Sequence, residues 1–212
     1  MKPAREVGGD FYDIVKIDDE HICFVIADVS GKGVSAAMFM FLAKTMLKNY
    51  VKLNLQPNEV FEIVNNDLCE SNDANMFVTV FMGILNTITG ELKYVNAGHN
   101  PPIIYKSSTK QAEYIQMKPG FVLAGLEDIK YQYDSIRLEK GDSIFMYTDG
   151  VTEAQNKYDE LFGDDRLLAI FNEEGFTNKE LKAVLEEVDK KIFEFADAVE
   201  QADDITMLAF RL

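Results

Sequence analysis

Acidic residues beside apolar runs are the part of this sequence with the clearest potential for chemistry. Four sites have this setting: Asp10, Asp28, Asp149 and the pair formed by Asp203 and Asp204. Each adjoins a run rich in Val, Ile, Phe or Met that has the composition of a buried strand. A carboxylate there is costly unless it is paired or binds a cation. Four such sites, far apart in the chain, predict one shared cation centre.

The chemistry that such a centre supports is metal-assisted hydrolysis. Sites made only of oxygen ligands select hard divalent ions such as Mg²⁺ or Mn²⁺. Two ions held ~4 Å apart can activate a water and clamp a phosphoryl group, so that no serine or cysteine nucleophile is needed. The sequence agrees, because it has neither a Gly-x-Ser-x-Gly elbow nor a cysteine-led phosphate loop. The alternative is that these aspartates form turns and helix caps, which suits one site better than four together.

The elements that must position these carboxylates can be predicted from residue patterns. Residues 21–29 form a strand, and residues 35–53 form a helix that is apolar nearly all round and is expected to be buried on more than one side. Its methionines at 38, 40 and 46 are expected to fill the core. A second helix begins at Pro57, and residues 76–95 form a hairpin that turns at Gly90.

The remaining strands are expected at 103–105, 112–117, 131–138, 143–147 and 202–212, with helices at 164–171 and 178–195. Because the strands cluster in hairpins, the pattern predicts an α+β fold of two antiparallel sheets with helices outside. The length of 212 residues suits a single domain over residues 1–212.

Composition excludes several classes of function. With 36 acidic and 21 basic residues the net charge is −15, which argues against non-specific nucleic-acid binding. The sequence shows no signal peptide and no apolar run of about 18 residues, so no membrane contact is expected. Cys23 and Cys69 lack the spacing of a zinc site and are expected to be reduced core thiols. A cytoplasmic location is therefore predicted.

A set of short strings carries a family resemblance. In order they are VGGDFYD, ADVSGKG, FVT, NAGHNPP, YTDGVTEAQN, FG and ADDIT. The chain resembles the metal-dependent, protein phosphatase 2C-type (PP2C-type) serine/threonine phosphatases, in the bacterial branch of SpoIIE and RsbU. The resemblance implies a four-layer α-β-β-α sandwich, two Mn²⁺ or Mg²⁺ ions, and hydrolysis of phosphoserine or phosphothreonine by a metal-activated water.

The resemblance also implies roles for the acidic residues. Asp28 would bridge both ions. Asp10 would hold one of them, with the backbone carbonyl of Val29 beside it. Asp149 and Asp203 would hold the other ion. Asp28 and Asp149 would therefore act in catalysis through the metal-bound water.

The sequence leaves the roles of several other candidate site residues open. The first acidic residue of the terminal motif is the family's ligand, so Asp203 is preferred over Asp204. Arg5 and Lys32 are candidates for gripping the substrate phosphate, and a surface salt bridge is the alternative for Arg5. His99, between a glycine and an asparagine, is a candidate catalytic group or a loop former that bonds backbone carbonyls.

Two other functions compete with the phosphatase. One is a non-catalytic binding module with a phosphatase fold, which would have no need of four buried acidic sites. The other is a GGDEF-type nucleotide cyclase, suggested by Gly8-Gly9-Asp10. That motif requires a glutamate where this chain has Phe11, and it lies mid-domain rather than near the first residue.

The resemblance further implies partners and regulation. The branch usually acts on an anti-sigma-factor antagonist, a STAS-domain protein. Because Asp10 is only the tenth residue, little chain precedes it for the strand that flanks this motif in the branch. We therefore expect an upstream sensor or activator, weak metal binding, low basal activity and self-association as a homodimer. The branch usually carries a Pro-Leu-Gly string near residues 122–125, where this chain has Val122-Leu123-Ala124-Gly125 instead, so different contacts are expected there.

Overall fold

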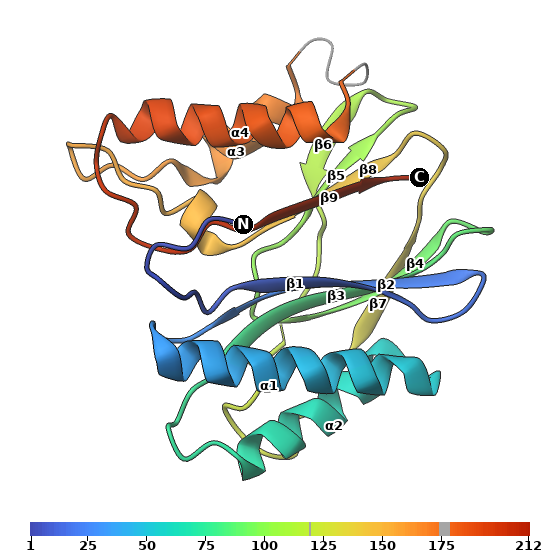
Figure 1. Cartoon of the computed structure of the whole chain (residues 1–212). Coiled ribbons are helices and arrows are strands. Elements are labelled where there is room, and N and C mark those ends of the chain that lie inside the picture. Colours follow the sequence, from blue (N-terminus) through green and yellow to red (C-terminus); the bar gives the residue numbers. More distant parts are fainter. Residues whose placement is uncertain (119, 174–178) are drawn as a thin grey trace. The chain divides into compact units, whose positions relative to one another are not determined.

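The computed structural model describes residues 1–118, 120–173 and 179–212 (Figure 1). The chain divides into two units. Unit 1 comprises Met1–Ala4, Asn100–Gln116 and Glu139–Leu212, and unit 2 comprises Arg5–His99 and Met117–Leu138. That residues 1–212 act as one domain remains a prediction.

Unit 2 is built on a five-stranded antiparallel sheet. Its strands, in spatial order, are β1 (Phe11–Lys16), β2 (His21–Val29), β3 (Val78–Asn86), β4 (Glu91–Ala97) and β7 (Tyr133–Arg137). Strand β2 has the predicted bounds because its dense Ile, Val and Phe content suits a strand buried between two neighbours. The predicted hairpin is β3–β4, and Gly90 supplies the left-handed turn residue at φ 75°.

Two helices cover one face of this sheet (Figure 1). Helix α1 (Val34–Tyr50) runs into a 3₁₀ turn, η1 (Val51–Leu53), and α2 (Pro57–Glu70) follows. Helix α2 starts at the predicted proline. A capping box stabilises that start, because the Glu59 side chain accepts a 2.7 Å hydrogen bond from the Gln56 amide.

The prediction that the first long helix is buried on more than one side is wrong. Val34, Met38 and Phe41 are 70–71% exposed and lie along one face of α1 at helical spacing. The residues that are buried are Ala36, Phe39, Ala43 and Leu47. Of the three methionines, Met40 and Met46 pack against the core as expected, whereas Met38 does not. Apolar residue types therefore continue onto a face that the sheet does not cover.

Unit 1 is built on a four-stranded antiparallel sheet. Its strands, in spatial order, are β6 (Gln111–Tyr114), β5 (Ile103–Lys106), β8 (Ser143–Tyr147) and β9 (Met207–Arg211). Helices α3 (Gly163–Phe171) and α4 (Leu181–Ala196) lie over one face of it (Figure 1). The helix predicted at 178–195 corresponds to α4, which begins at Leu181 and ends at Ala196. The first predicted residue, Asn178, lies outside the described residues.

Each unit thus supplies one antiparallel sheet and one layer of helices. The α+β class and the two antiparallel sheets flanked by helices are confirmed. The last strand is shorter than predicted, because regular pairing with β8 starts only at Met207. Just before it, Ile205 forms an isolated antiparallel bridge with Lys2, with N···O distances of 2.8 and 2.9 Å.

Strand β1 is an element that residue patterns did not reveal. Its six residues alternate, with Phe11 and Val15 buried in the core while Tyr12 and Ile14 are exposed. Apolar residues therefore occur on both faces of β1, which among the described residues lies at the edge of its sheet and pairs with β2. That mixture hides the polar–apolar alternation by which a half-buried strand is usually found.

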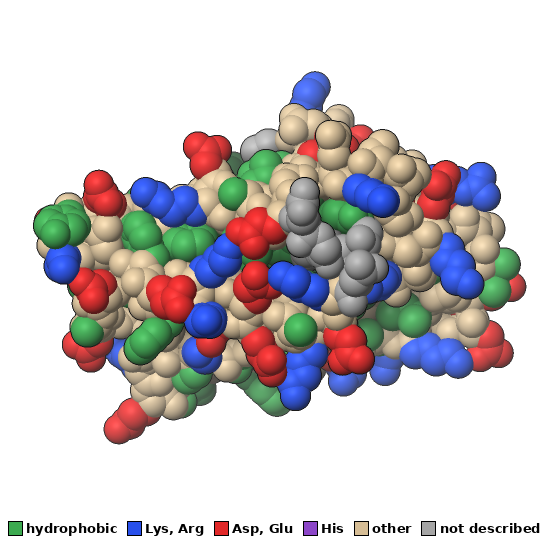
Figure 2. Space-filling model, turned by 90° about the horizontal axis from the view of Figure 1, so that it is seen from above, with side chains coloured by type: hydrophobic (Ala, Val, Ile, Leu, Met, Phe, Trp, Pro, Cys, Tyr) green, Lys and Arg blue, Asp and Glu red, His purple; other side chains and the backbone are tan. Residues whose placement is uncertain are grey.

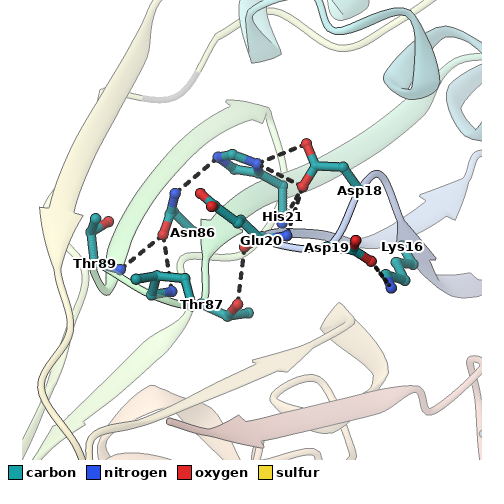
Figure 3. A network of polar contacts seen from close by, with 9 residues as sticks. Lys16, Asp18, Asp19, Glu20, His21, Asn86, Thr87 and Thr89 are labelled. Atoms are coloured by element: carbon teal, nitrogen blue, oxygen red, sulfur yellow. Dashed lines mark hydrogen bonds and ion pairs between the residues drawn. The ribbon is translucent and has the colours of Figure 1, made fainter.

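A polar network closes the end of the unit 2 sheet that carries the β1–β2 and β3–β4 turns (Figure 3). Asn86 accepts hydrogen bonds through its side-chain oxygen Oδ1 from the amides of Ile88 and Thr89, at 3.0 and 2.8 Å. Its amide nitrogen must then donate to His21 Nε2, 3.1 Å away. His21 Nδ1 lies 3.0 Å from the Asp18 carboxylate. Two turns distant in sequence are held together at this end.

The structure also bears on the predictions about the two cysteines and about membrane-spanning helices. Cys23 and Cys69 are free, and burial raises the pKa of both thiols, so both stay protonated at neutral pH. In the described parts of the chain, each helix falls short of the length and hydropathy needed to cross a bilayer.

We expect Ala124→Gly to stabilise the protein by roughly 0.5–1 kcal/mol, because Ala124 occupies the left-handed region at φ 64°, where a Cβ is strained. This residue lies in the segment that departs from Pro-Leu-Gly. Its amide donates to Asn65 and its carbonyl accepts from Asn72, each at 3.0 Å. Thermal unfolding should shift upward by about 2–4 °C per kcal/mol. The matched control, Ala37→Gly inside α1, should shift downward; a fall for Ala124→Gly would contradict the argument.

Candidate metal centre

Two of the predicted ligands face each other at one end of the unit 2 sheet. The antiparallel register pairs Phe11 with Ala27, so the next pair outward is Asp10 and Asp28. Asp10 is 1% exposed and Asp28 is half-buried. Side chains at opposed positions of adjacent strands lie on the same face of the sheet. The fold therefore gathers two carboxylates at the end of β1 and β2.

The backbone before Asp10 packs closely against Val29. A Cβ placed on Gly9 would lie 2.9 Å from the Val29 carbonyl oxygen, closer than side chains approach backbone oxygens. A glycine is therefore required at position 9 on steric grounds. This contact places the Val29 carbonyl next to the segment that carries Asp10, and its role as a main-chain ligand stays a prediction.

Thr79 lies next to Asp28 on the neighbouring strand and connects it to His99. Asp28 is paired with Thr79 in the β2–β3 register, and the Thr79 hydroxyl lies 2.9 Å from His99 Nδ1. His99 is buried, and Asn96 bonds both its amide and its carbonyl, at 2.7 and 2.8 Å. Thr79 was not among the predicted site residues, although it ends the string FVT. Thr79 is identified by its pairing with Asp28 across the sheet, which the sequence alone does not show.

Unit 1 carries the other predicted ligands at the end of β8 and the start of β9. Beyond the last regular pair, the Thr148 amide donates to the Thr206 carbonyl at 3.1 Å. The Thr206 amide donates in turn to the Thr148 hydroxyl at 3.0 Å. Asp149, at the start of the 3₁₀ turn η2 (Asp149–Val151), follows this pair on one side, and Asp204 precedes it on the other.

Gly150 allows these two segments to lie in contact. A Cβ on Gly150 would lie 2.0 Å from the Asp204 carbonyl oxygen and 3.4 Å from that of Asp203. The backbone after Asp149 therefore passes directly against the backbone of the acidic pair. No side chain larger than hydrogen fits at position 150 without displacing one segment from the other.

Asp203 and Asp204 differ in their surroundings. Asp204 is buried, and its carboxylate accepts a 2.7 Å hydrogen bond from the amide of Ala4. Asp203 is half-buried, and its carboxylate accepts from the Asp204 amide at 2.9 Å. Asp204 thus anchors the first residues of the chain, which agrees with the preference for Asp203 as a ligand. That preference stays a prediction.

The candidate phosphate-binding residues are both exposed. Arg5 belongs to unit 2, six residues before the start of β1. Lys32 lies between Gly31 and Gly33, whose φ angles of 83° and 85° turn the chain into α1. Their assignment to a substrate phosphate remains a prediction.

The structure brings the predicted ligands together within each unit. Asp10 and Asp28, with Val29, belong to unit 2, whereas Asp149 and Asp203 belong to unit 1. Over the described residues, the His, Cys, Asp and Glu side chains form no group of three or more that could hold a metal ion. The donors are carboxylates and a carbonyl, which fit Mg²⁺ or Mn²⁺.

Comparison with known proteins identifies the family. The model of stage II sporulation protein E (SpoIIE) matches residues 18–212. Phosphoserine phosphatase RsbU of Bacillus subtilis is 35% identical over 155 residues, covering 73% of this chain and 46% of RsbU. The chain spans less than half the length of the curated relatives it matches.

Solved structures share the fold. The PP2C domain of SiaA from Pseudomonas aeruginosa has a TM-score of 0.85 at 20% identity, covering all of this chain and 83% of that one. RsbX in complex with magnesium has a TM-score of 0.71 at 18% identity, covering 98% and 89%. The sequence match does not support the cyclase alternative. The chain belongs to the SpoIIE family of PP2C-type phosphatase domains.

Proposed function

We propose that this chain is the catalytic domain of a metal-dependent phosphoprotein phosphatase that hydrolyses phosphoserine and phosphothreonine. The observation that carries the proposal is the facing pair of Asp10 and Asp28 at the end of β1 and β2. Two carboxylates placed next to each other, one of them buried, favour the binding of a cation, because like charges repel. Membership of the SpoIIE family and the name of RsbU, a phosphoserine phosphatase, support the reaction.

The proposed ligands are Asp28 for two ions, Asp10 and the Val29 carbonyl for one, and Asp149 with Asp203 for the other. Mn²⁺ or Mg²⁺ bound there would supply an activated water and neutralise charge on the phosphoryl group. The structure of RsbX with magnesium supports that choice of ion. Because Gly9 has no side chain, the backbone that carries Asp10 can lie close to Val29. Because Gly150 has none, the backbone after Asp149 can lie close to the Asp203–Asp204 segment.

The substrate and partners form a second level of the proposal. We infer from the branch that the substrate is a phosphorylated anti-sigma-factor antagonist with a STAS domain. An upstream sensor or activator, homodimer formation and a cytoplasmic location belong to the same proposal. The non-catalytic binding module is the alternative, and turnover separates the two.

The test is hydrolysis of p-nitrophenyl phosphate and of a phosphoserine peptide with Mn²⁺, with Mg²⁺ and after chelation. We expect turnover with either ion and its loss with the chelator. Calorimetry with Mn²⁺ should show binding in the absence of substrate. Metal binding without turnover of either substrate would favour the binding module, and absence of both would refute the proposed function.

His99→Ala separates a catalytic role from a structural one. If the imidazole transfers a proton, kcat should fall by roughly a hundredfold or more with little change in KM. The Asn96 contacts to the His99 backbone predict the opposite outcome: a folded loop and near-normal turnover. A fall in kcat below about threefold would exclude general acid catalysis. Thr79→Val, which removes only the 2.9 Å contact to Nδ1, is the matched variant.

A further inference from the structure

A cavity in unit 1 opens beside the proposed ligands Asp149 and Asp203. Its volume is about 170 Å³, and Gly150 and Asp203 form part of its wall. The rest of the lining comes from α4, from the residues after η2 and from the segment that leads into β9. An engineered apolar cavity of ~150 Å³ accommodates benzene, so this space suits a long side chain better than a single ion.

The lining combines an apolar wall with carboxylates. Its main apolar members are Phe193, Val199 and Ile205, and its carboxylates include Glu153, Glu200 and Asp203. Phe193 projects from α4 with 74% of its surface exposed, which is unusual for an aromatic residue. Figure 2 looks onto the face with α4, where hydrophobic side chains lie exposed among acidic and basic ones.

The charge of the cavity favours a cation. Lys2 is the basic residue among the described lining, and its ammonium lies 2.6 Å from both carboxylate oxygens of Asp189. The positive charge of Lys2 and the negative charge of Asp189 cancel in this ion pair. Two further acidic lining residues that are not proposed metal ligands, Glu153 and Glu200, add negative charge to the cavity.

We propose that this cavity binds an arginine side chain of the phosphoprotein substrate, close in sequence to the phosphorylated residue. The methylene stem would lie along the apolar wall, with the guanidinium at Glu153 and Glu200 and over the exposed face of Phe193. Arginine fits better than lysine because its planar head stacks on aromatic rings. This inference rests on the proposed function, since it names a specificity feature of the same site.

The test uses three phosphoserine peptides that differ at one position, which is arginine, citrulline or alanine. Citrulline keeps the shape of arginine but removes its charge. For the unchanged protein we expect kcat/KM to be about tenfold higher for the arginine peptide than for the other two. The preference should shrink as ionic strength rises, because exposed charges are screened.

Variants assign the preference to the cavity. The double variant Glu153→Gln with Glu200→Gln should reduce the preference to within about twofold, and Phe193→Ala should weaken it. Glu194→Gln, on the same helix but outside the cavity, is the control. Hydrolysis of p-nitrophenyl phosphate should be unchanged in all of them, which shows that fold and metal centre are intact.

The outcomes separate this inference from the proposed function. Equal kcat/KM for the three peptides, or a preference that survives in the double variant, would overturn the arginine site. If p-nitrophenyl phosphate is not hydrolysed with Mn²⁺, the proposed function fails instead. In that case fluorescence anisotropy with the unphosphorylated peptides still tests the cavity, because binding of the arginine peptide should depend on Glu153 and Glu200 without any turnover.

Discussion

Replacing Asp28 with asparagine is expected to lower Mn²⁺-dependent phosphatase activity by about a thousandfold or more, because the residue proposed to bridge both ions loses its charge. The fold should survive. Asp28 faces Asp10 across β1 and β2, so removing one charge relieves repulsion in the metal-free protein and should raise its melting temperature slightly. The measurements are p-nitrophenyl phosphate turnover, Mn²⁺ calorimetry and thermal unfolding with and without metal.

A matched control is Asp19→Asn, in the β1–β2 turn at the other end of the same sheet. Asp19 forms an exposed ion pair with Lys16, so its replacement should change neither turnover nor metal affinity. Asp149→Asn should behave like Asp28→Asn. Substantial Mn²⁺-dependent turnover by Asp28→Asn would remove that residue from the proposed centre.

Gly150→Ala is expected to be the most damaging change that removes no charged or polar group. A Cβ there would lie 2.0 Å from the Asp204 carbonyl oxygen, so one of the two backbones must move. Overpacking of this kind costs roughly 1–3 kcal/mol of folding free energy. A displacement of about 1 Å between Asp149 and Asp203 can lower activity by ~100-fold. Urea unfolding and turnover at saturating Mn²⁺ measure the two effects.

Gly163→Ala separates steric overlap from backbone strain. Gly163 has φ 79°, and a Cβ there would meet no atom within 4 Å, so only the left-handed penalty of about 1–2 kcal/mol applies. Its turnover should stay close to that of the unchanged protein. If Gly150→Ala retained full activity and metal affinity, the close packing of the Asp149 loop would have no role in the centre.

Residue patterns predict the elements of this fold well where apolar runs are continuous. Strand β2 and the start of α2 lie where their composition places them. Patterns fail where apolar residue types are also exposed. The outer face of α1 is apolar yet exposed, and β1 carries apolar residues on both faces, so it shows no polar–apolar alternation. Hydrophobic periodicity reports which side chains could be buried, and tertiary packing decides which of them are.

The candidate site was predictable as a set of residues but not as an arrangement. The order of the acidic strings identifies Asp10, Asp28 and Asp149 as candidates, and family resemblance assigns their roles. The facing of Asp10 and Asp28 depends on strand register, which no local pattern specifies. The anchoring of Ala4 by Asp204 joins residues 200 positions apart. Such long-range contacts follow from the folded topology.

The interleaving of the two units along the chain has a consequence for attempts to dissect the protein. Unit 1 uses residues from Met1 to Leu212, so the shortest piece of chain that contains all of it is the whole sequence. The shortest piece that contains unit 2, Arg5–Leu138, also carries β5 and β6 but lacks β8, to which β5 is hydrogen-bonded. Such a piece would expose an unpaired strand edge and tend to aggregate. Half-proteins would therefore be poor reagents here, and point variants in the full chain are the better means of studying each half of the proposed centre.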